Sequence, residues 1–494
     1  MQEHIRALIV IIFLSGIGFA LAKKIVQQDV LATDFNRWRN VWFAVTITVF
    51  LSQNFWLYLL FSGFLILLLT TRAQNKMALF FILLFAIPPI GNTIPGFGLV
   101  NYIITLTHPR FIELIILLPA ALVVFRNNNF KFTKIWADKL LLIYILLLIA
   151  LELRDTTLTD ALRKSFYIFT DVFLPYYVAS RSIKDLSQMK TVLSAFITSA
   201  VIISLIAIFE SLKHWILYNG LGAAIGTGGS MSNYLVRSGE IRALATLGHP
   251  IVLGYFMTIA FGFYLFISNS IQNTTFKRLG FLLIILGLLA PLSRGPWVGA
   301  MILLVAYILQ GTMAIKKLSI LFLAGLISFS ILAVSPGGQK FINLIPFAGE
   351  TEKGNITYRE QLFKNSMIVI NRNPLLGSSH YLETPEMLEM KQGGGIIDIV
   401  NTYLRVTLEA GYIGLLLFIG IFISVIWGVR KNMKLIKDKK TPLHILGRCL
   451  VSVIFGIMIT IATTSSIATV PIIYWSVLGI GVAYTQIVKQ NTLP

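Results

Sequence analysis

Three arginines of this 494-residue chain stand beside apolar segments, where they could bind phosphate. Arg242 opens the run RALATLGHP, Arg294 lies in SRGPWVG, and Arg359 lies in ITYREQL. A guanidinium stays charged, and its planar fork matches phosphate oxygens two at a time. Each arginine alone is also compatible with anchoring, because interfacial arginines extend toward lipid phosphates. Together they predict a site that holds a diphosphate and neutralises it as it leaves.

Four further residues are candidates for proton transfer or for positioning. His249 precedes a proline at an expected helix start, where a capping or packing role is the alternative interpretation. His380, in PLLGSSHY, has a side chain that can act as a base near neutral pH. Asp398 and Glu409 flank the segment DIVNTYLRVTLEAGYIG, and capping is the favoured role for Asp398. The sequence has no cluster with metal-ligand spacing, so we expect neither a metal nor a cofactor.

Several common enzyme signatures are absent from the sequence. It contains no Walker motif, no dinucleotide-binding glycine fingerprint, no HExxH and no GxSxG. The glycine-rich run at 222–229 (GAAIGTGG) is interpreted as a flexible turn. The single cysteine, Cys449, excludes a disulfide framework.

Composition identifies the medium in which these residues must work. Hydrophobic residues make up 56% of the chain, charged residues 13%, and the mean hydropathy is +0.79. A soluble domain has about 45–50% apolar and about 25% charged residues. We therefore expect one polytopic transmembrane domain over residues 1–494. The net charge of +20 lies in short loops between apolar blocks, so nucleic acid is not an expected partner.

The apolar blocks predict an all-α fold with about 12–15 transmembrane helices. The clear candidates are 6–22, 109–125, 137–152, 190–211, 251–269, 279–293, 296–312, 317–335, 411–428, 444–463 and 467–487. Four stretches are shorter or more polar and could be tilted, hairpin or re-entrant: 41–52, 54–70, 77–90 and 165–180.

Loop charges predict the orientation of these helices. The loop 429–443 is rich in lysine, and Lys277-Arg278 and Lys316-Lys317 mark two more basic loops. Placing these loops in the cytoplasm leaves the long segment 336–410 on the opposite, extracytoplasmic side. Within that segment, 357–371 has apolar residues at helical spacing and predicts an amphipathic helix on the membrane face. The candidate arginines then share the extracytoplasmic side.

The order of these motifs resembles the O-antigen ligase and O-antigen polymerase superfamily of bacterial glycan enzymes. The matching pieces are RALATLGHP, SRGPWVGA, the loop arginine Arg359, NPLLG at 373–377 and NTYLRVTLEAGYIGLLLF. The resemblance covers about residues 190–430. The upstream run DALRKSFYIFTDVFLPYYVASR is similar to the exopolysaccharide-polymerase branch.

The resemblance implies an integral-membrane glycosyltransferase of the bacterial inner membrane with an extracytoplasmic active face. Such an enzyme takes a glycan from a polyprenyl-diphosphate carrier and joins it to a hydroxyl of an acceptor glycan, without a metal or nucleotide sugar. Arg242 and Arg359 match the family's functional arginines, and Arg294 matches a supporting one. The remaining expected substrate-binding residues lie in or beside the motifs: His249, Tyr358, Asn401 and Tyr403. Besides the donor, the acceptor and membrane lipid, a chain-length regulator or export protein is an expected partner.

One departure from the family pattern separates the remaining alternatives. Ligases of the superfamily carry a histidine before the Asn-x-Tyr-Leu segment, whereas this chain has Val400 before Asn401. Valine cannot move a proton, so Asp398 and His380 are the candidate bases, and a polysaccharide polymerase is favoured over a ligase. A transporter or flippase is the alternative from another class. It would use acidic residues at membrane depth, for which Glu210 and Asp171 are the candidates.

Overall fold

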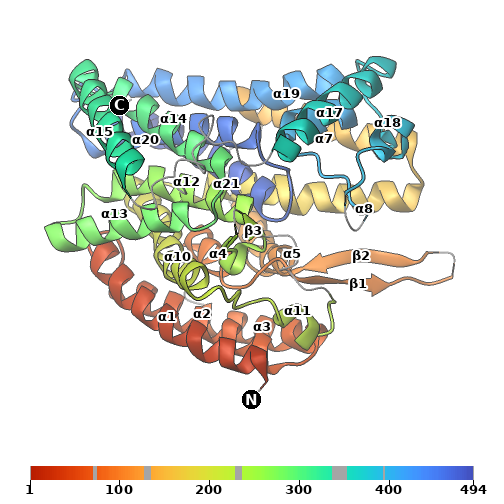
Figure 1. The fold of residues 1–494 in the computed structure, drawn as a ribbon, viewed down its shortest axis with the longest axis horizontal. Helices are drawn as coiled ribbons and strands as arrows, with labels where there is room; N and C mark the ends of the chain where they lie inside the picture. Colours follow the sequence, from red (N-terminus) through yellow and green to blue (C-terminus); the bar gives the residue numbers. More distant parts are fainter. Residues whose placement is uncertain are drawn as a thin grey trace.

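The chain folds into a bundle of helices, shown as a computed structural model in Figure 1. The structure describes residues 2–70, 75–98, 100–126, 135–228, 236–237, 239–335, 353–392 and 395–492. The beginning of the predicted long loop, 336–352, and part of the glycine-rich run at 222–229 lie outside the described residues.

Helices make up most of the described chain. The first half contains α1 (Glu3–Val26), α2 (Ala32–Leu51), α3 (Phe55–Thr70), α4 (Lys76–Leu84), α5 (His108–Ile112), η1 (Glu113–Leu117), α6 (Leu118–Arg126), α7 (Trp136–Asp155), α8 (Leu158–Ile168), η2 (Phe169–Phe173), α9 (Leu174–Ser182) and α10 (Leu186–Lys213). The second half contains α11 (Leu221–Ala224), η3 (Ala245–Leu247), α12 (Pro250–Ile267), α13 (Thr274–Leu289), α14 (Arg294–Leu309), α15 (Ala314–Val334), α17 (Lys353–Arg372), η4 (Tyr381–Glu383), α18 (Pro385–Leu388), α19 (Thr402–Met433), α20 (Pro442–Ile461) and α21 (Val470–Thr492).

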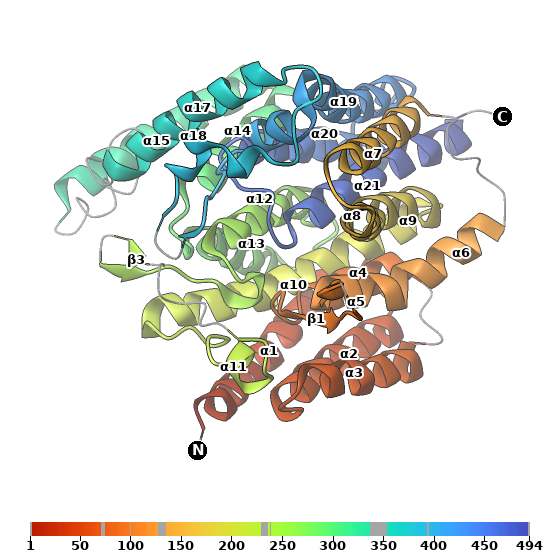
Figure 2. The same cartoon turned by 90° about the vertical axis from the view of Figure 1, so that its right-hand side faces the viewer.

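The described strands form two short antiparallel pairs. One is β1 (Gly91–Pro95) with β2 (Tyr102–Thr107), and the other is β3 (Val236–Arg237) with β4 (Glu240–Ile241). The first pair projects from one end of the bundle, at the right of Figure 1. Figure 2 faces this end and places β1 between a layer with α2 and α3 and a layer with α19 and α20.

The helices have the length and composition of membrane spans. Among the described residues, eight helices are long and apolar enough to cross a membrane, and two shorter apolar helices are α3 and α14. The predicted all-α polytopic membrane fold is therefore confirmed. The helix predicted over 357–371 is also present, as α17.

Small residues bring neighbouring helices into close contact. A Cβ atom on Gly299 of α14 would lie 2.0 Å from the Thr460 hydroxyl of α20, and one on Gly456 of α20 would lie 3.0 Å from Cβ of Leu303. In lipid, where apolar side chains gain little by leaving the solvent, such close packing is a main source of helix association. These contacts fix α14 beside α20.

One end of the bundle, which we call the basic end, brings together Arg430, Lys434, Lys437 and Lys439. At the basic end, Lys190 Nζ lies 2.9 Å from Asp29 Oδ1 and 3.3 Å from Ser270 Oγ, which joins the turns after α1 and α12 to the start of α10. The opposite end, which we call the loop end, carries the β1–β2 pair, α17 and α18 (Figure 1). The positive-inside rule predicts that the basic end faces the cytoplasm.

A kink in α19 receives the segment that follows α17. Gly411 has φ 64° and ψ −170°, so the helix is interrupted there. The backbone N–H groups of Tyr412 and Ile413 donate to the carbonyl oxygens of Pro374 and Leu375, at 2.8 and 3.2 Å. The sequence motifs NPLLG and EAGYIG are therefore hydrogen-bonded to each other, and their glycines permit the contact.

We expect Gly411→Ala to destabilise the protein. Its added Cβ would lie 2.2 Å from the backbone of Leu375, and the positive φ disfavours any other residue. Overpacking of this kind costs about 1–3 kcal/mol. The measurement is the thermal unfolding midpoint in detergent. Gly420→Ala, whose Cβ would meet Leu140 at an ordinary 3.6 Å, is the control; equal midpoints for the two variants would contradict the role of the kink.

Candidate functional site

The loop that carries Arg242 is bound to the turn before α14. The Arg242 guanidinium donates from Nε to Pro291 O at 3.0 Å and from Nη2 to the Ser293 hydroxyl at 2.8 Å. Arg294 follows at once as the first residue of α14. Two of the three predicted arginines therefore lie on segments that are hydrogen-bonded to each other at the loop end.

A buried carboxylate in α10 holds the Arg242 loop in place. The side chain of Glu210 is fully buried and accepts hydrogen bonds from the backbone N–H groups of Leu217, Leu244 and Ala245, at 3.1, 2.9 and 2.8 Å. Backbone outside regular structure needs such acceptors because lipid supplies none. Glu210 thereby fixes the chain immediately after Arg242.

His249 lies where this loop enters α12. Its Nδ1 accepts a hydrogen bond from the backbone N–H of Ile251 at 3.2 Å, so the capping interpretation is confirmed. Burial, and then the positive charge of Arg242, lower the pKa of His249 to about 4, against an opposing effect of Asp398. His249 is therefore neutral at pH 7 and close enough to Arg242 and Asp398 to respond to their charges.

Asp398 joins the same group of residues from the other side. Its Oδ1 accepts a hydrogen bond from the Ser465 hydroxyl at 2.5 Å, and its backbone oxygen accepts one from the Tyr358 hydroxyl at 3.0 Å. The predicted capping role of Asp398 is wrong. Asn401 caps α19 instead, with its side-chain oxygen accepting from the backbone N–H of Tyr403 at 2.9 Å. We call Arg242, His249, Tyr358 and Asp398 the arginine–aspartate cluster.

Arg359, the third predicted arginine, follows Tyr358 on α17 and is exposed. Tyr358 is half-buried, and burial raises its pKa, so its hydroxyl stays a hydrogen-bond donor. Because Tyr358 is bonded to Asp398, α17 is fixed beside the arginine–aspartate cluster. The predicted diphosphate-binding role of Arg359 stays a prediction.

Two predicted site residues bind elsewhere in the fold. The His380 ring lies at the corner between α7 and α8, with Nε2 2.7 Å from Asp155 O and Nδ1 3.2 Å from the Glu383 carboxylate. These two contacts raise the pKa of His380. The Tyr403 hydroxyl donates to Met458 O at 2.8 Å, which joins α19 to α20.

A cavity of about 680 Å³ lies near the loop end. It is lined by α5, α7, α8 with η2, the first turns of α19, the α20–α21 loop and the start of α21. The charged side chains among its described lining residues are Arg110, Lys164, Asp171, Arg405 and Glu409.

Two π-helical turns shape the helices that border this cavity. η1 interrupts the helix formed by α5 and α6, and η2 interrupts the helix formed by α8 and α9. Such turns are rare and are frequent at functional sites. Arg110 lies one turn before η1, and Asp171 lies within η2. Two charged lining residues of the cavity are therefore in or beside a π-helical turn.

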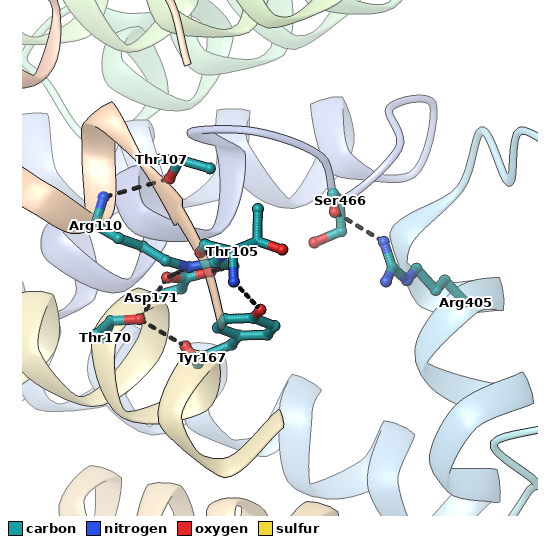
Figure 3. A network of polar contacts seen from close by, with 8 residues as sticks. All are labelled: Thr105, Thr107, Arg110, Tyr167, Thr170, Asp171, Arg405 and Ser466. Carbon is teal, nitrogen blue, oxygen red and sulfur yellow. Dashed lines mark hydrogen bonds and ion pairs between the residues drawn. The ribbon is translucent and has the colours of Figure 1, made fainter. Parts of the chain in front are cut away.

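Arg110 and Asp171 form a two-point ion pair on one wall (Figure 3). Arg110 donates from Nε to Asp171 Oδ1 at 3.0 Å and from Nη2 to Oδ2 at 2.8 Å. Its Nη1 donates to Thr105 O at 3.0 Å, and the guanidinium lies 3.7 Å from the centre of the Tyr167 ring. All three guanidinium nitrogens of Arg110 thus already have protein partners.

The other two cations of the cavity are also paired. Arg405 donates from Nε to Glu409 Oε1 and from Nη1 to Ser466 O, each at 2.9 Å (Figure 3 shows the second bond). Lys164 Nζ lies 3.1 Å from Glu152 Oε1. Each basic residue among the described lining therefore has its own carboxylate.

The loop between α20 and α21 connects the cavity with the arginine–aspartate cluster. Ser465 binds Asp398 through its hydroxyl, and the next residue, Ser466, binds Arg405 through its carbonyl oxygen. The two sets of residues are therefore neighbours along one short segment.

Sequence reasoning missed most of the cavity. It considered Asp171 only as an acid at membrane depth and Glu409 only as a flanking carboxylate, and it did not single out Arg110, Lys164 or Arg405. One available signal was the i, i+4 spacing of Arg405 and Glu409, which favours an ion pair on a helix.

We expect the thermal stability to fall as the pH is lowered from about 6.5 to about 4, partly through His249. The unfolded state takes up a proton on this histidine near its ordinary pKa of 6.5, whereas the folded state does so only near 4. The measurement is the unfolding midpoint against pH. His249→Asn keeps a capping side chain and removes the titration, so it should flatten the curve; an unchanged slope would contradict the burial of a neutral His249.

The geometry can be compared with known proteins. Residues 279–419 match the family model described as O-Antigen ligase, a range that runs from α13 through the kink of α19 and includes Arg294, Arg359 and Asp398. No curated protein matches the chain. Over residues 279–419 the chain is therefore similar to the O-antigen ligase family, which supports the predicted resemblance to the O-antigen ligase and polymerase superfamily.

Proposed function

We propose that the protein is an extracytoplasmic glycan polymerase that transfers oligosaccharide repeat units from a polyprenyl-diphosphate carrier to a hydroxyl of an acceptor glycan. The observation that supports this most strongly is that Arg242 and Asp398, more than 150 residues apart in the sequence, both lie near enough to His249 to affect its pKa. The family match supports a polymerase or a ligase in general. The narrower choice rests on Val400, which replaces the histidine of the ligases.

In the proposed reaction, the acceptor hydroxyl attacks the anomeric carbon of the donor sugar. The new glycosidic C–O bond forms as the bond to the diphosphate breaks, and the diphosphate leaves with the electron pair. Arg242 and Arg359, with Arg294 supporting them, stabilise its charge, which is the kind of preorganised electrostatic contribution that dominates many enzyme reactions. Asp398 accepts the hydroxyl proton and returns it to water.

His249 has a different part in this proposal. Because burial keeps it neutral at pH 7, it adds no positive charge to the diphosphate site. Its capping bond fixes the start of α12 beside Arg242, so it positions the substrate-binding loop. His380 is less suited than Asp398 as the base, since its ring nitrogens lie against Asp155 and Glu383.

A transport function is less consistent with the two acidic candidates. Glu210 accepts three backbone hydrogen bonds, and both oxygens of Asp171 accept from Arg110. Each carboxylate therefore has a structural task in the protein. A carrier would need such groups to exchange partners during transport.

Arg359→Ala should reduce polymerisation by about 10²–10³-fold, the usual effect of removing one preorganised donor to a developing charge. The measurement is size-resolved analysis of surface and carrier-linked glycans in a deletion host. Loss of long chains, with single repeat units accumulating on the carrier, is the expected result. Arg372→Ala removes an exposed arginine from the same helix and is the control.

Other outcomes of this experiment would replace the proposal. Long chains that form on the carrier without reaching their acceptor would identify a ligase. Unchanged glycans in Arg359→Ala would exclude the assigned role of this arginine and favour transport.

The proposed orientation is tested by cysteine labelling. Cys449 is the single cysteine of the chain and is buried, so Cys449→Ser provides a background for new labels. We expect Glu389→Cys at the loop end to react with a membrane-impermeant maleimide in intact cells. Lys437→Cys at the basic end should react only after the membrane is opened. The reverse pattern would place the active face in the cytoplasm.

A further inference from the structure

We propose that the charge-paired cavity near the loop end binds the acceptor saccharide through its hydroxyl groups. The role of this saccharide as the acceptor rests on the proposed function. The assignment of a saccharide as the ligand depends on the cavity alone.

Charge pairing argues against a diphosphate in this cavity. The described lining carries three cations and two carboxylates, and the third cation, Lys164, is paired with Glu152 just outside the lining. A diphosphate would have to compete with Asp171 for Arg110 and with Glu409 for Arg405. It would also lie beside both carboxylates, which repel it. A neutral, hydroxyl-rich ligand has neither problem.

The polar groups of the cavity retain capacity to bind hydroxyls. The side chains of Asp171 and Glu409 keep 23% and 24% of their surface exposed, so their oxygens can accept further hydrogen bonds. Arg405 uses Nε and Nη1 for its bonds to Glu409 and Ser466, and its side chain is 32% exposed. A planar carboxylate can accept hydrogen bonds from two neighbouring hydroxyls of a sugar ring at the same time.

Aromatic rings supply the apolar part of the same surface. Tyr144, Tyr167 and Tyr474 line the cavity together with Trp475. Tyr144, Tyr474 and Trp475 are at most 5% exposed, and Arg110 lies over one face of the Tyr167 ring. These rings therefore offer a sugar ring limited apolar contact, and the hydroxyls bind mainly to the polar groups. The volume of about 680 Å³ lies within the range of about 300–1,000 Å³ that is usual for small-ligand sites, and it suits a short saccharide.

The position of the cavity connects it with the proposed chemistry. Ser466 contacts Arg405 in the cavity wall, and Ser465 contacts Asp398 in the arginine–aspartate cluster. Consecutive residues of one loop therefore contact the cavity wall and the carboxylate that accepts the hydroxyl proton. Acceptor and donor would meet at the α20–α21 loop.

The test is a binding measurement on the full-length protein in detergent, with no donor present. The probe is a set of phosphate-free oligosaccharides of one to three repeat units, released by partial hydrolysis from the polysaccharide of the producing cell. Inorganic pyrophosphate is the second probe. Isothermal titration should show saturable saccharide binding to the wild type, unaffected by pyrophosphate.

Two variants test the cavity itself. Glu409→Gln removes a charged hydrogen-bonding group and should weaken saccharide binding by about tenfold or more. Leu148→Trp places a larger apolar side chain in the cavity lining without removing a charged group, and it should abolish binding. Glu389→Gln, an exposed carboxylate at the same end, is the matched control and should bind as the wild type does. The unfolding midpoints of all variants establish that they are folded.

Two results would overturn the inference. One is the absence of saturable saccharide binding, or binding that both cavity variants leave unchanged. The other is pyrophosphate binding that tightens in Glu409→Gln, because a cavity with one fewer negative charge would then be an anion site. Neither result depends on the Arg359→Ala glycan profile, so failure of this inference and failure of the proposed function are distinguishable.

Discussion

Irregular backbone inside an apolar bundle must find its hydrogen-bond partners within the protein, and one buried carboxylate meets that need here. Glu210 accepts from three backbone N–H groups, two of them in the loop that follows Arg242. Arg242 in turn binds the turn before α14, and His249 ends the same loop by capping α12. The loop that carries Arg242 is therefore organised around hydrogen bonds between one buried side chain and the backbone.

Charge is distributed differently in two pockets of the described part of the chain. In the cavity near the loop end, each described basic lining residue is balanced by a carboxylate, and the surface is suited to a neutral ligand. At the basic end, a pocket of about 580 Å³ is lined by Arg430, Lys434, Lys437 and Lys439, and its described lining contains no carboxylate. Paired charges in the pocket near the loop end and an excess of positive charge in the pocket at the basic end agree with different environments on the two sides of a membrane.

Hydropathy predicted the membrane fold, because apolar length alone decides whether a helix can span a bilayer. It placed the start of α2 near residue 41, whereas the helix begins at Ala32. Asp34 and Arg37 make the first turns polar in the sequence, but in the structure they form an ion pair at 2.6 Å. The residues of the arginine–aspartate cluster were predicted from the sequence motifs in or beside which they lie. The cavity was not predicted, because contacts such as the bond between Arg405 and Ser466 join segments 61 residues apart and leave no periodic pattern in the sequence.

The two π-helical turns have a consequence for comparing this chain with its relatives. Each such turn accommodates one residue more than the α-helical turn it replaces, so the residues beyond it face a direction shifted by about 100°. A homologue without the turn would align correctly only with a one-residue gap inside a hydrophobic span, a place where alignments rarely allow gaps. Gaps at 113–117 and 169–173 would therefore mark lineages in which this cavity arose or was lost.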